Sequence, residues 1–124
     1  DYRVAEVAPK KLKKNADEMT LTLVKNPDIL GSARSTFGFK GVLVGFAAET
    51  DSIETNALRK LERKGCDFLV ANDVSRRDIG FDQEENEVIL FSATGGRETL
   101  GRKSKDEIAQ EIMARILPEG LSEP

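Results

Sequence analysis

Two short apolar runs separated by a helical pattern constrain the fold of this chain more than any other feature. Residues 41–48 read Gly-Val-Leu-Val-Gly-Phe-Ala-Ala, and residues 66–71 read Cys-Asp-Phe-Leu-Val-Ala. Such runs are typical of strands buried on both faces, as in parallel sheets. Between them, Asp51 and Glu54 match a capping box and Gly65 suits a helix end. Strand, helix and strand in this order predict a parallel unit of an α/β fold.

Further elements are predicted on the N-terminal side. Residues 19–24 alternate in a way that suits a strand with one buried face. Asn26 is a good helix N-cap, Pro27 suits the first helical position, and Asp28 complements the helix dipole. The apolar side chains expected to face the core are Ile29, Leu30, Ala33 and Phe37 from this helix, and Ile53, Ala57, Leu58 and Leu61 from the helix between the two runs.

The C-terminal part predicts a hairpin and a last helix. Residues 87–92 and 97–101 form two strand-like segments joined across a glycine pair, which indicates a β-hairpin. Ser104 and Glu107 match a second capping box. The inward side chains of the helix that follows are expected to be Ile108, Ile112, Met113 and Ile116, and its end is expected at Pro118 and Gly120.

The composition fits one globular domain and excludes several classes of function. Of the 124 residues, 39% are apolar and 33% are charged, which is ordinary for such a domain. The net charge of -3 argues against a general nucleic-acid binder. The longest apolar run, residues 42–48, is far shorter than the roughly 20 residues of a membrane helix. We therefore expect neither a nucleic acid nor a membrane as partner.

The chain has no histidine and a single cysteine. It therefore cannot build a histidine-based triad or a tetrahedral zinc site by itself. Any metal ion would be a hard cation held by oxygen atoms, and we name no metal ligand. Cys66 cannot form an internal disulfide, which fits a reducing, cytoplasmic compartment, and we expect it to be a buried thiol.

Candidate binding residues lie where the predicted elements meet. Ligands of open α/β sheets bind beyond the carboxyl ends of the strands, which are here residues 48–50 and 71–73. Asp51 and Asn72 can alternatively be plain turn and cap residues. The helix start at residues 26–29 offers free N–H groups to a phosphate or a base, although most helix starts bind nothing.

Two clusters of cations could bind a polyphosphate. Residues 10–14 hold four lysines, which suits a triphosphate or a leaving pyrophosphate. Lys60 and Lys64 lie on one face of the predicted helix, at positions i and i+4. Either cluster could equally be a solvated charged surface. The standard dinucleotide and P-loop sites are disfavoured, because the glycines have the wrong spacing for GxGxxG and no GxxxxGK[ST] motif is present.

The order of several segments resembles the ligase domain of bacterial phosphopantothenoylcysteine synthetase, over nearly the whole chain. The segments that carry the resemblance are Asp1-Tyr2-Arg3, Val7-Ala8-Pro9, Lys11-Leu12-Lys13-Lys14, Lys25-Asn26-Pro27-Asp28-Ile29, Val44-Gly45-Phe46-Ala47-Ala48-Glu49-Thr50 and Ala71-Asn72-Asp73-Val74-Ser75. Six segments in the same order are far more specific than any one of them.

The resemblance implies a fold and a set of partners. The expected fold is a three-layer, Rossmann-like α/β domain with a partly parallel sheet, helices on both faces, a β-hairpin and a dimerisation strand at residues 19–24. Residues 1–124 would be the C-terminal portion of one ligase domain. Two parallel strands leave exposed sheet edges and the chain starts at Asp1 rather than Met, so we expect an upstream half that completes the sheet. A homodimer, that upstream half, or both are the expected protein partners.

The resemblance also implies a reaction. The family joins 4'-phosphopantothenate to cysteine, with CTP in most bacteria and ATP in some relatives. An acyl-cytidylate forms as pyrophosphate leaves, and the cysteine amine then displaces CMP. Mg²⁺ is the expected metal cofactor, and FMN is expected only if a decarboxylase domain precedes the ligase. Because the family's glycine-rich loop and an essential asparagine lie in the upstream half, the chain alone is not expected to turn over.

Residue by residue, Lys11 matches the first lysine of the family's KxKK motif, which is tied to formation of the acyl-nucleotide, and it is the implied catalytic residue. The other implied nucleotide-binding residues are Asp1, Asn26, Pro27, Asp28, Ile29, Phe46, Lys60 and Lys64. The alternative hypothesis is a non-catalytic nucleotide-binding or dimerisation module of similar fold. An unrelated Rossmann-like oxidoreductase is disfavoured by the absent glycine motif.

Overall fold

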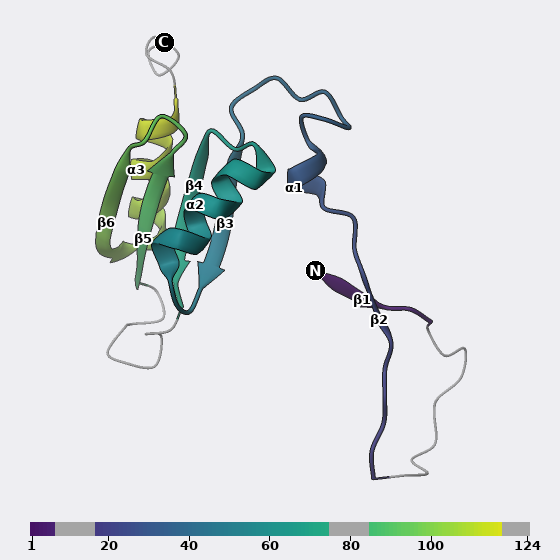
Figure 1. Ribbon diagram of the computed structural model, residues 1–124. Helices are drawn as coiled ribbons and strands as arrows, with labels where there is room; N and C mark the ends of the chain where they lie inside the picture. Colours follow the sequence, from purple (N-terminus) through teal and green to yellow (C-terminus); the bar gives the residue numbers. More distant parts are fainter. Residues whose placement is uncertain (7–16, 75–84, 118–124) are drawn as a thin grey trace.

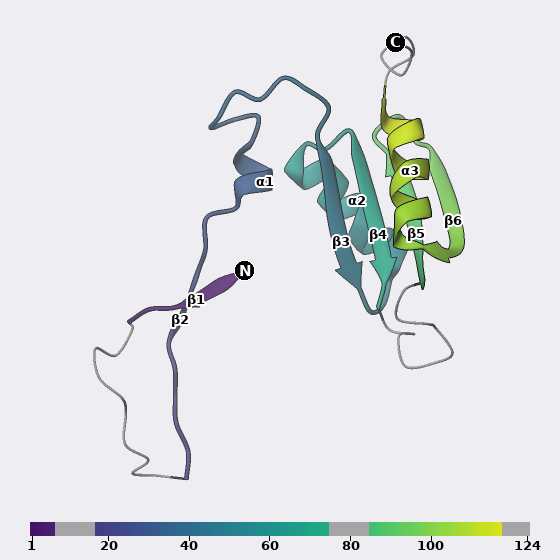
Figure 2. The same ribbon diagram turned by 180° about the vertical axis from the view of Figure 1, so that it is seen from behind.

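The computed structural model describes residues 1–6, 17–74 and 85–117 (Figure 1). Its elements, in chain order, are β1 (Tyr2–Val4), β2 (Leu23–Lys25), α1 (Ile29–Ser32), β3 (Val44–Glu49), α2 (Ile53–Lys64), β4 (Phe68–Asp73), β5 (Glu85–Ser92), β6 (Arg97–Ser104) and α3 (Lys105–Ile116). β1 and β2 form an antiparallel pair that lies apart from the main sheet in both ribbon views (Figure 1, Figure 2). The predicted helix end at Pro118 and Gly120 lies outside the described residues.

A four-stranded sheet in the order β3-β4-β5-β6 forms the centre of the fold. β3 and β4 are parallel, and the remaining neighbours are antiparallel. α2 connects the parallel strands and covers one face of the sheet, while α3 covers the other face (Figure 2). The predicted α/β class, parallel unit, hairpin and helices on both faces are therefore confirmed.

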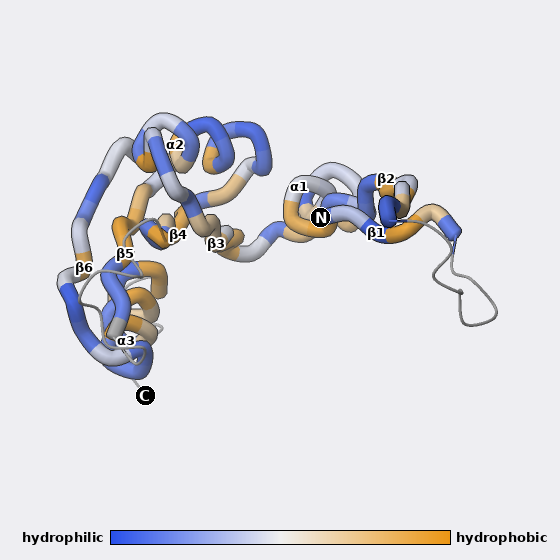
Figure 3. Tube along the Cα trace, turned by 90° about the horizontal axis from the view of Figure 1, so that it is seen from below, coloured by the Kyte–Doolittle hydropathy of each residue, from blue (hydrophilic) through white to orange (hydrophobic). Residues whose placement is uncertain are grey.

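Alternating side chains of the central strands divide the core into two clusters. On the α2 face, Leu69 and Phe91 pack with Ala57. On the α3 face, Val70 packs with Ile108. Seen along the strands, the apolar parts of β4 and β5 lie between the two helices (Figure 3). β4 is thus the strand that matches the predicted burial on both faces.

Gly45 in β3 lies close to Leu30 of α1, Leu69 of β4 and the buried Cys66. A Cβ atom at this position would lie 2.9 Å from Leu30 Cδ2, 3.0 Å from Leu69 Cδ1 and 3.2 Å from Cys66 Sγ. Leu69 and Cys66 are both buried, so they have little room to move away. The sheet therefore needs a residue without a side chain here.

We expect Gly45→Ala to lower the free energy of unfolding by about 1–3 kcal/mol, the usual cost of overpacking a core. Urea unfolding followed by circular dichroism measures this loss. Gly101→Ala is the matched control, because Gly101 also lies in a strand and a Cβ there would meet nothing within 4 Å. Equal stability of the two variants would contradict the packing explanation.

Within the described residues, the helix ends follow the predicted signals in two of four cases. Gly65 ends α2 in the left-handed conformation, with φ of 68°, as predicted. Ser104 caps α3, where its Oγ accepts from the Glu107 N–H at 3.2 Å, so the predicted N-cap is confirmed; the Glu107 carboxylate accepts from Ser104 Oγ at 3.1 Å. The box predicted at Asp51 is wrong, because the turn after β3 places the N-cap one residue later, at Ser52, whose side chain makes no capping bond.

The start of α1 also differs from the prediction. Its N-cap is Asp28, whose Oδ1 accepts from the Gly31 N–H at 3.0 Å, and not Asn26. Asn26 instead continues the β1–β2 pairing, because its N–H donates to Asp1 O at 2.9 Å. Pro27 consequently precedes the helix rather than opening it.

Several apolar residues that were predicted to face the core are exposed. The strand predicted over residues 19–24 is wrong in its extent, because β2 begins only at Leu23. It is also wrong in its buried face, because β1 pairs with the edge of β2 and covers neither face of that strand. β3 begins only at Val44 and is buried on one face, because it is an edge strand and α3 packs over β5 and β6 instead. The exposed side chains that contradict the predicted core are Met19, Leu21, Leu23, Ile29, Phe37, Val42, Phe46, Leu58 and Met113.

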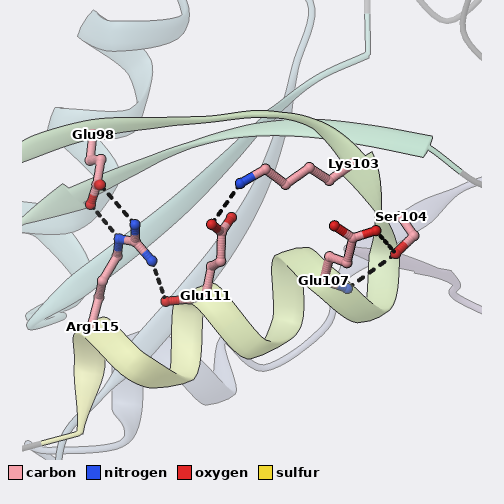
Figure 4. Close-up of polar contacts among 6 residues, drawn as sticks. All are labelled: Glu98, Lys103, Ser104, Glu107, Glu111 and Arg115. Carbon is pink, nitrogen blue, oxygen red and sulfur yellow. Dashed lines mark hydrogen bonds and ion pairs between the residues drawn. The ribbon is translucent and has the colours of Figure 1, made fainter.

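Polar contacts tie α3 to β6 on the far side of the sheet (Figure 4). Arg115 forms a two-pronged ion pair with Glu98 and donates from Nη1 to Glu111 O at 2.8 Å. The guanidinium of Arg115 holds the pKa of the Glu98 carboxyl below its usual value. Lys103 Nζ donates to Glu111 Oε1 at 2.6 Å.

In the part of the chain that the structure describes, no helix has the length and apolar character needed to cross a membrane.

Candidate nucleotide site

A cavity of about 580 Å³ opens between the start of β1, the segment before α1, and the outer side of α2 and β3. Its walls include every nucleotide-binding residue implied by the resemblance except Lys11: Asp1, Asn26, Pro27, Asp28, Ile29, Phe46, Lys60 and Lys64. These residues come from four separate parts of the chain, and the fold brings them together. Lys11 lies outside the described residues.

The two lysines of α2 stand one helical turn apart on the side that faces the cavity. Lys60 Nζ donates to Glu49 Oε1 at 2.6 Å, and Lys64 Nζ donates to Asp28 Oδ2 at 2.8 Å. The Lys64 side chain is only 20% exposed and that of Lys60 is 36% exposed. Both lysines are therefore held by carboxylates at the helix surface rather than extending freely into solvent.

Each lysine keeps hydrogen-bonding capacity for a ligand. An ammonium group has three N–H donors, and the carboxylate contact of each lysine uses one of them. Within the described residues no side-chain contact occupies the other donors of either ammonium group, and both lysines line the cavity. Arg63, between them in sequence, also lines the cavity and adds a third cation.

Asp28 has two structural roles at this site. Its Oδ1 caps α1 by accepting from the Gly31 N–H, and its Oδ2 accepts a hydrogen bond from the Lys64 ammonium. Hydrogen bonds from Lys64 and from the Gly31 N–H hold the pKa of the Asp28 carboxyl below its usual value. The segment before α1 is thereby joined to the C-terminal half of α2 at the wall of the cavity.

Two exposed apolar side chains complete the walls. Phe46 is 72% exposed and Ile29 is 73% exposed, yet both line the cavity. The aromatic ring of Phe46 provides a flat surface on which a base can stack, and Ile29 adds further apolar surface to the same cavity. The cavity thus combines an apolar surface with a cationic wall, which suits a molecule with an aromatic and an anionic end.

Residues at the carboxyl ends of the parallel strands are not among those that line this cavity. Glu49 ends β3, is nearly buried, and is paired with Lys60. Asp51 lies in the turn before α2, in agreement with the turn interpretation. Asn72 belongs to β4, not to a turn, and its Oδ1 is buried without a hydrogen-bond partner in the described residues. It lines a separate cavity of about 290 Å³ beneath α3.

Sequence reasoning missed the partners of the lysines. Neither Glu49 nor Asp28 was predicted to hold an ammonium group, and no pattern of spacing links residues so far apart in the chain. The sequence did indicate Arg63 as a candidate, because it belongs to the same basic helix as Lys60 and Lys64.

Within residues 1–6, 17–74 and 85–117, no group of three or more metal-ligating side chains occurs. The expected Mg²⁺ therefore stays a prediction.

Comparison with known proteins gives a consistent family. The profile of the DNA/pantothenate metabolism flavoprotein C-terminal domain matches residues 1–119. The coenzyme A biosynthesis bifunctional protein CoaBC of Vibrio vulnificus is 45% identical over 118 residues, covering 94% of this chain and 29% of that protein. The CoaBC protein of Escherichia coli K12 is 42% identical, covering 87% of this chain and 29% of that protein.

Solved structures agree with this relationship. The crystal structure of the C-terminal domain of a CoaBC protein has a TM-score of 0.70 and 30% identity, covering 94% of this chain and 47% of that one. A Cab2 H337A mutant in complex with phosphopantothenate-cysteine, at 22% identity and a TM-score of 0.53, shares the fold. The chain therefore spans less than a third of its bifunctional relatives and about half of the solved domain.

Proposed function

This chain belongs to the family of the DNA/pantothenate metabolism flavoprotein C-terminal domain, and we propose that it is the nucleotide-binding part of a phosphopantothenate-cysteine ligase. The ligase would use CTP to couple 4'-phosphopantothenate to cysteine in coenzyme A biosynthesis. The single observation that carries the proposal is the cavity in which the two α2 lysines, Phe46 and the segment before α1 meet.

The proposed reaction has two steps. The carboxylate of phosphopantothenate attacks the α-phosphate of CTP, the bond to the β-phosphate breaks, and pyrophosphate leaves with its electron pair. The amine of cysteine then attacks the acyl carbon, loses a proton, and displaces CMP. Both steps need positive charge around phosphate groups, and Lys60 and Lys64 would supply part of it for bound CTP. Mg²⁺ on the triphosphate would supply more.

The apolar part of the cavity suits the other end of CTP. We propose that Phe46 and Ile29 contact the base and ribose, while the cationic wall binds phosphates. Asp1 and residues 26–28 would supply polar contacts between these two ends. The carboxylates of Glu49 and Asp28 hold the lysine side chains in place before the nucleotide arrives.

The proposed protein partners follow from surfaces that the described residues leave uncovered. Among the described strands, β3 has a sheet neighbour on one side only, and we propose that the other half of the ligase, which the longer relatives carry, supplies a further strand there. The apolar side chains of the β1–β2 arm, including Tyr2 and Leu23, are exposed. They are proposed to form a homodimer contact. FMN is proposed only for a decarboxylase domain in the same polypeptide.

The test joins this chain to the residues that precede the matched region in the Escherichia coli relative. With CTP, Mg²⁺, phosphopantothenate and cysteine, we expect the fused protein to release pyrophosphate and CMP, and without cysteine we expect an acyl-cytidylate that can be trapped. The chain alone is expected to show neither. Tight binding of CTP by the fused protein without any pyrophosphate release would favour a non-catalytic nucleotide-binding module instead.

A further inference from the structure

The side chain of Asn26, in the wall of the cavity, is held by an arginine of β1. Arg3 Nη1 donates to Lys25 O at 3.0 Å and to Asn26 Oδ1 at 3.3 Å. The Asn26 N–H donates in turn to Asp1 O at 2.9 Å. β1 and the residue before it thus hold both the side chain and the backbone of Asn26.

The chemistry of the guanidinium decides which way the carboxamide is turned. Arginine has N–H donors and no acceptor, so the atom of Asn26 that faces it must be the carbonyl oxygen. The amide nitrogen, which carries two donors, then lies on the opposite side of the group. The hydrogen bonds of Asn26 within the described residues use its N–H and Oδ1, which leaves Nδ2 for a bound molecule.

We propose that Arg3 is a positioning residue that turns the Asn26 Nδ2 donors toward the cavity, where they bind a hydrogen-bond acceptor of the nucleoside. The proposal rests on the nucleotide site proposed above. The acceptor belongs to the base or ribose rather than to the phosphates, because the charged donors of the cavity are gathered on α2, at Lys60, Arg63 and Lys64. Cytosine offers two acceptors, its carbonyl oxygen and a ring nitrogen.

The decisive variant is Asn26→Asp in the fused, complete ligase. Aspartate has the same shape and still accepts from Arg3, but it replaces the amide donors with an acceptor. We expect about tenfold weaker binding of both CTP and uncharged cytidine, measured by calorimetry and by NMR titration. Weaker binding of CTP alone would indicate charge repulsion and would overturn the proposal.

Arg3→Met tests the positioning role itself. Without the guanidinium the carboxamide can rotate, and we expect cytidine to bind several-fold less tightly. The double variant should bind no more weakly than Asn26→Asp alone, because Arg3 acts through the amide. Unchanged cytidine binding in Arg3→Met, or independent losses in the double variant, would refute the role of Arg3.

A purely structural role for Arg3 gives a different result. Asn26→Asp keeps, and by its charge strengthens, the contact with Arg3, so a structural role predicts no loss of cytidine binding in this variant and no loss of thermal stability. Failure of the proposed function would be seen separately, since the unsubstituted ligase would then bind neither CTP nor cytidine.

Discussion

Replacing Lys60 and Lys64 together with glutamine is expected to weaken CTP binding to the complete ligase by about 100-fold. Hydrogen bonds from charged donors contribute roughly 1.5–3 kcal/mol each, and about 1.4 kcal/mol corresponds to a factor of ten in affinity. Glutamine retains an N–H donor for Glu49 and Asp28, so the present contacts of both lysines can be kept while the charges are lost. Isothermal calorimetry with CTP and Mg²⁺ measures the change.

Lys103→Gln is the matched control for this double variant. Lys103 also pairs with a glutamate, Glu111, at 2.6 Å, and its side chain is 37% exposed against 36% for Lys60. It lies on the opposite side of the sheet, between β6 and α3 (Figure 4). We expect the Lys103→Gln variant to bind CTP with the same affinity as the unsubstituted protein. Equal losses at both places would mean that net charge, and not the cavity, determines CTP affinity.

The parallel unit of the fold could be predicted because its signals are local. The apolar run of β4 and the glycine at the end of α2 depend on neighbouring residues alone. The exposure of β3 could not be predicted, because an apolar run looks the same in a central strand and in an edge strand. Phe46 shows the consequence: it belongs to the run, yet its ring lines the cavity instead of the core.

The site was predicted less completely, for a related reason. The spacing of Lys60 and Lys64 places them on one face of a helix, but nothing local determines what that face meets. Asn26 and Asp28 are equally good N-caps by type, so the sequence could not choose between them. The structure selects Asp28, whose carboxylate serves the helix start and Lys64 at once, while Asn26 is occupied by the pairing with β1.

Lys11→Gln is expected to reduce formation of the acyl-cytidylate by about 100- to 1,000-fold, the usual cost of removing one donor that stabilises transition-state charge. The reason is the position implied by the family motif, close to the phosphate under attack. The effect should appear in the rate of the first half-reaction, with little change in CTP affinity. A single-turnover experiment without cysteine, quenched and assayed for acyl-cytidylate and pyrophosphate, measures it.

Lys10→Gln provides the control within the same basic segment, because it removes an adjacent charge that the family motif does not include. It should retain most of the activity. If Lys10→Gln and Lys11→Gln lose similar, small amounts of rate, the segment acts as a diffuse positive field and no single catalytic lysine exists. A large loss of CTP affinity in Lys11→Gln would instead place Lys11 with Lys60 and Lys64, as a group that binds the nucleotide before any bond is made.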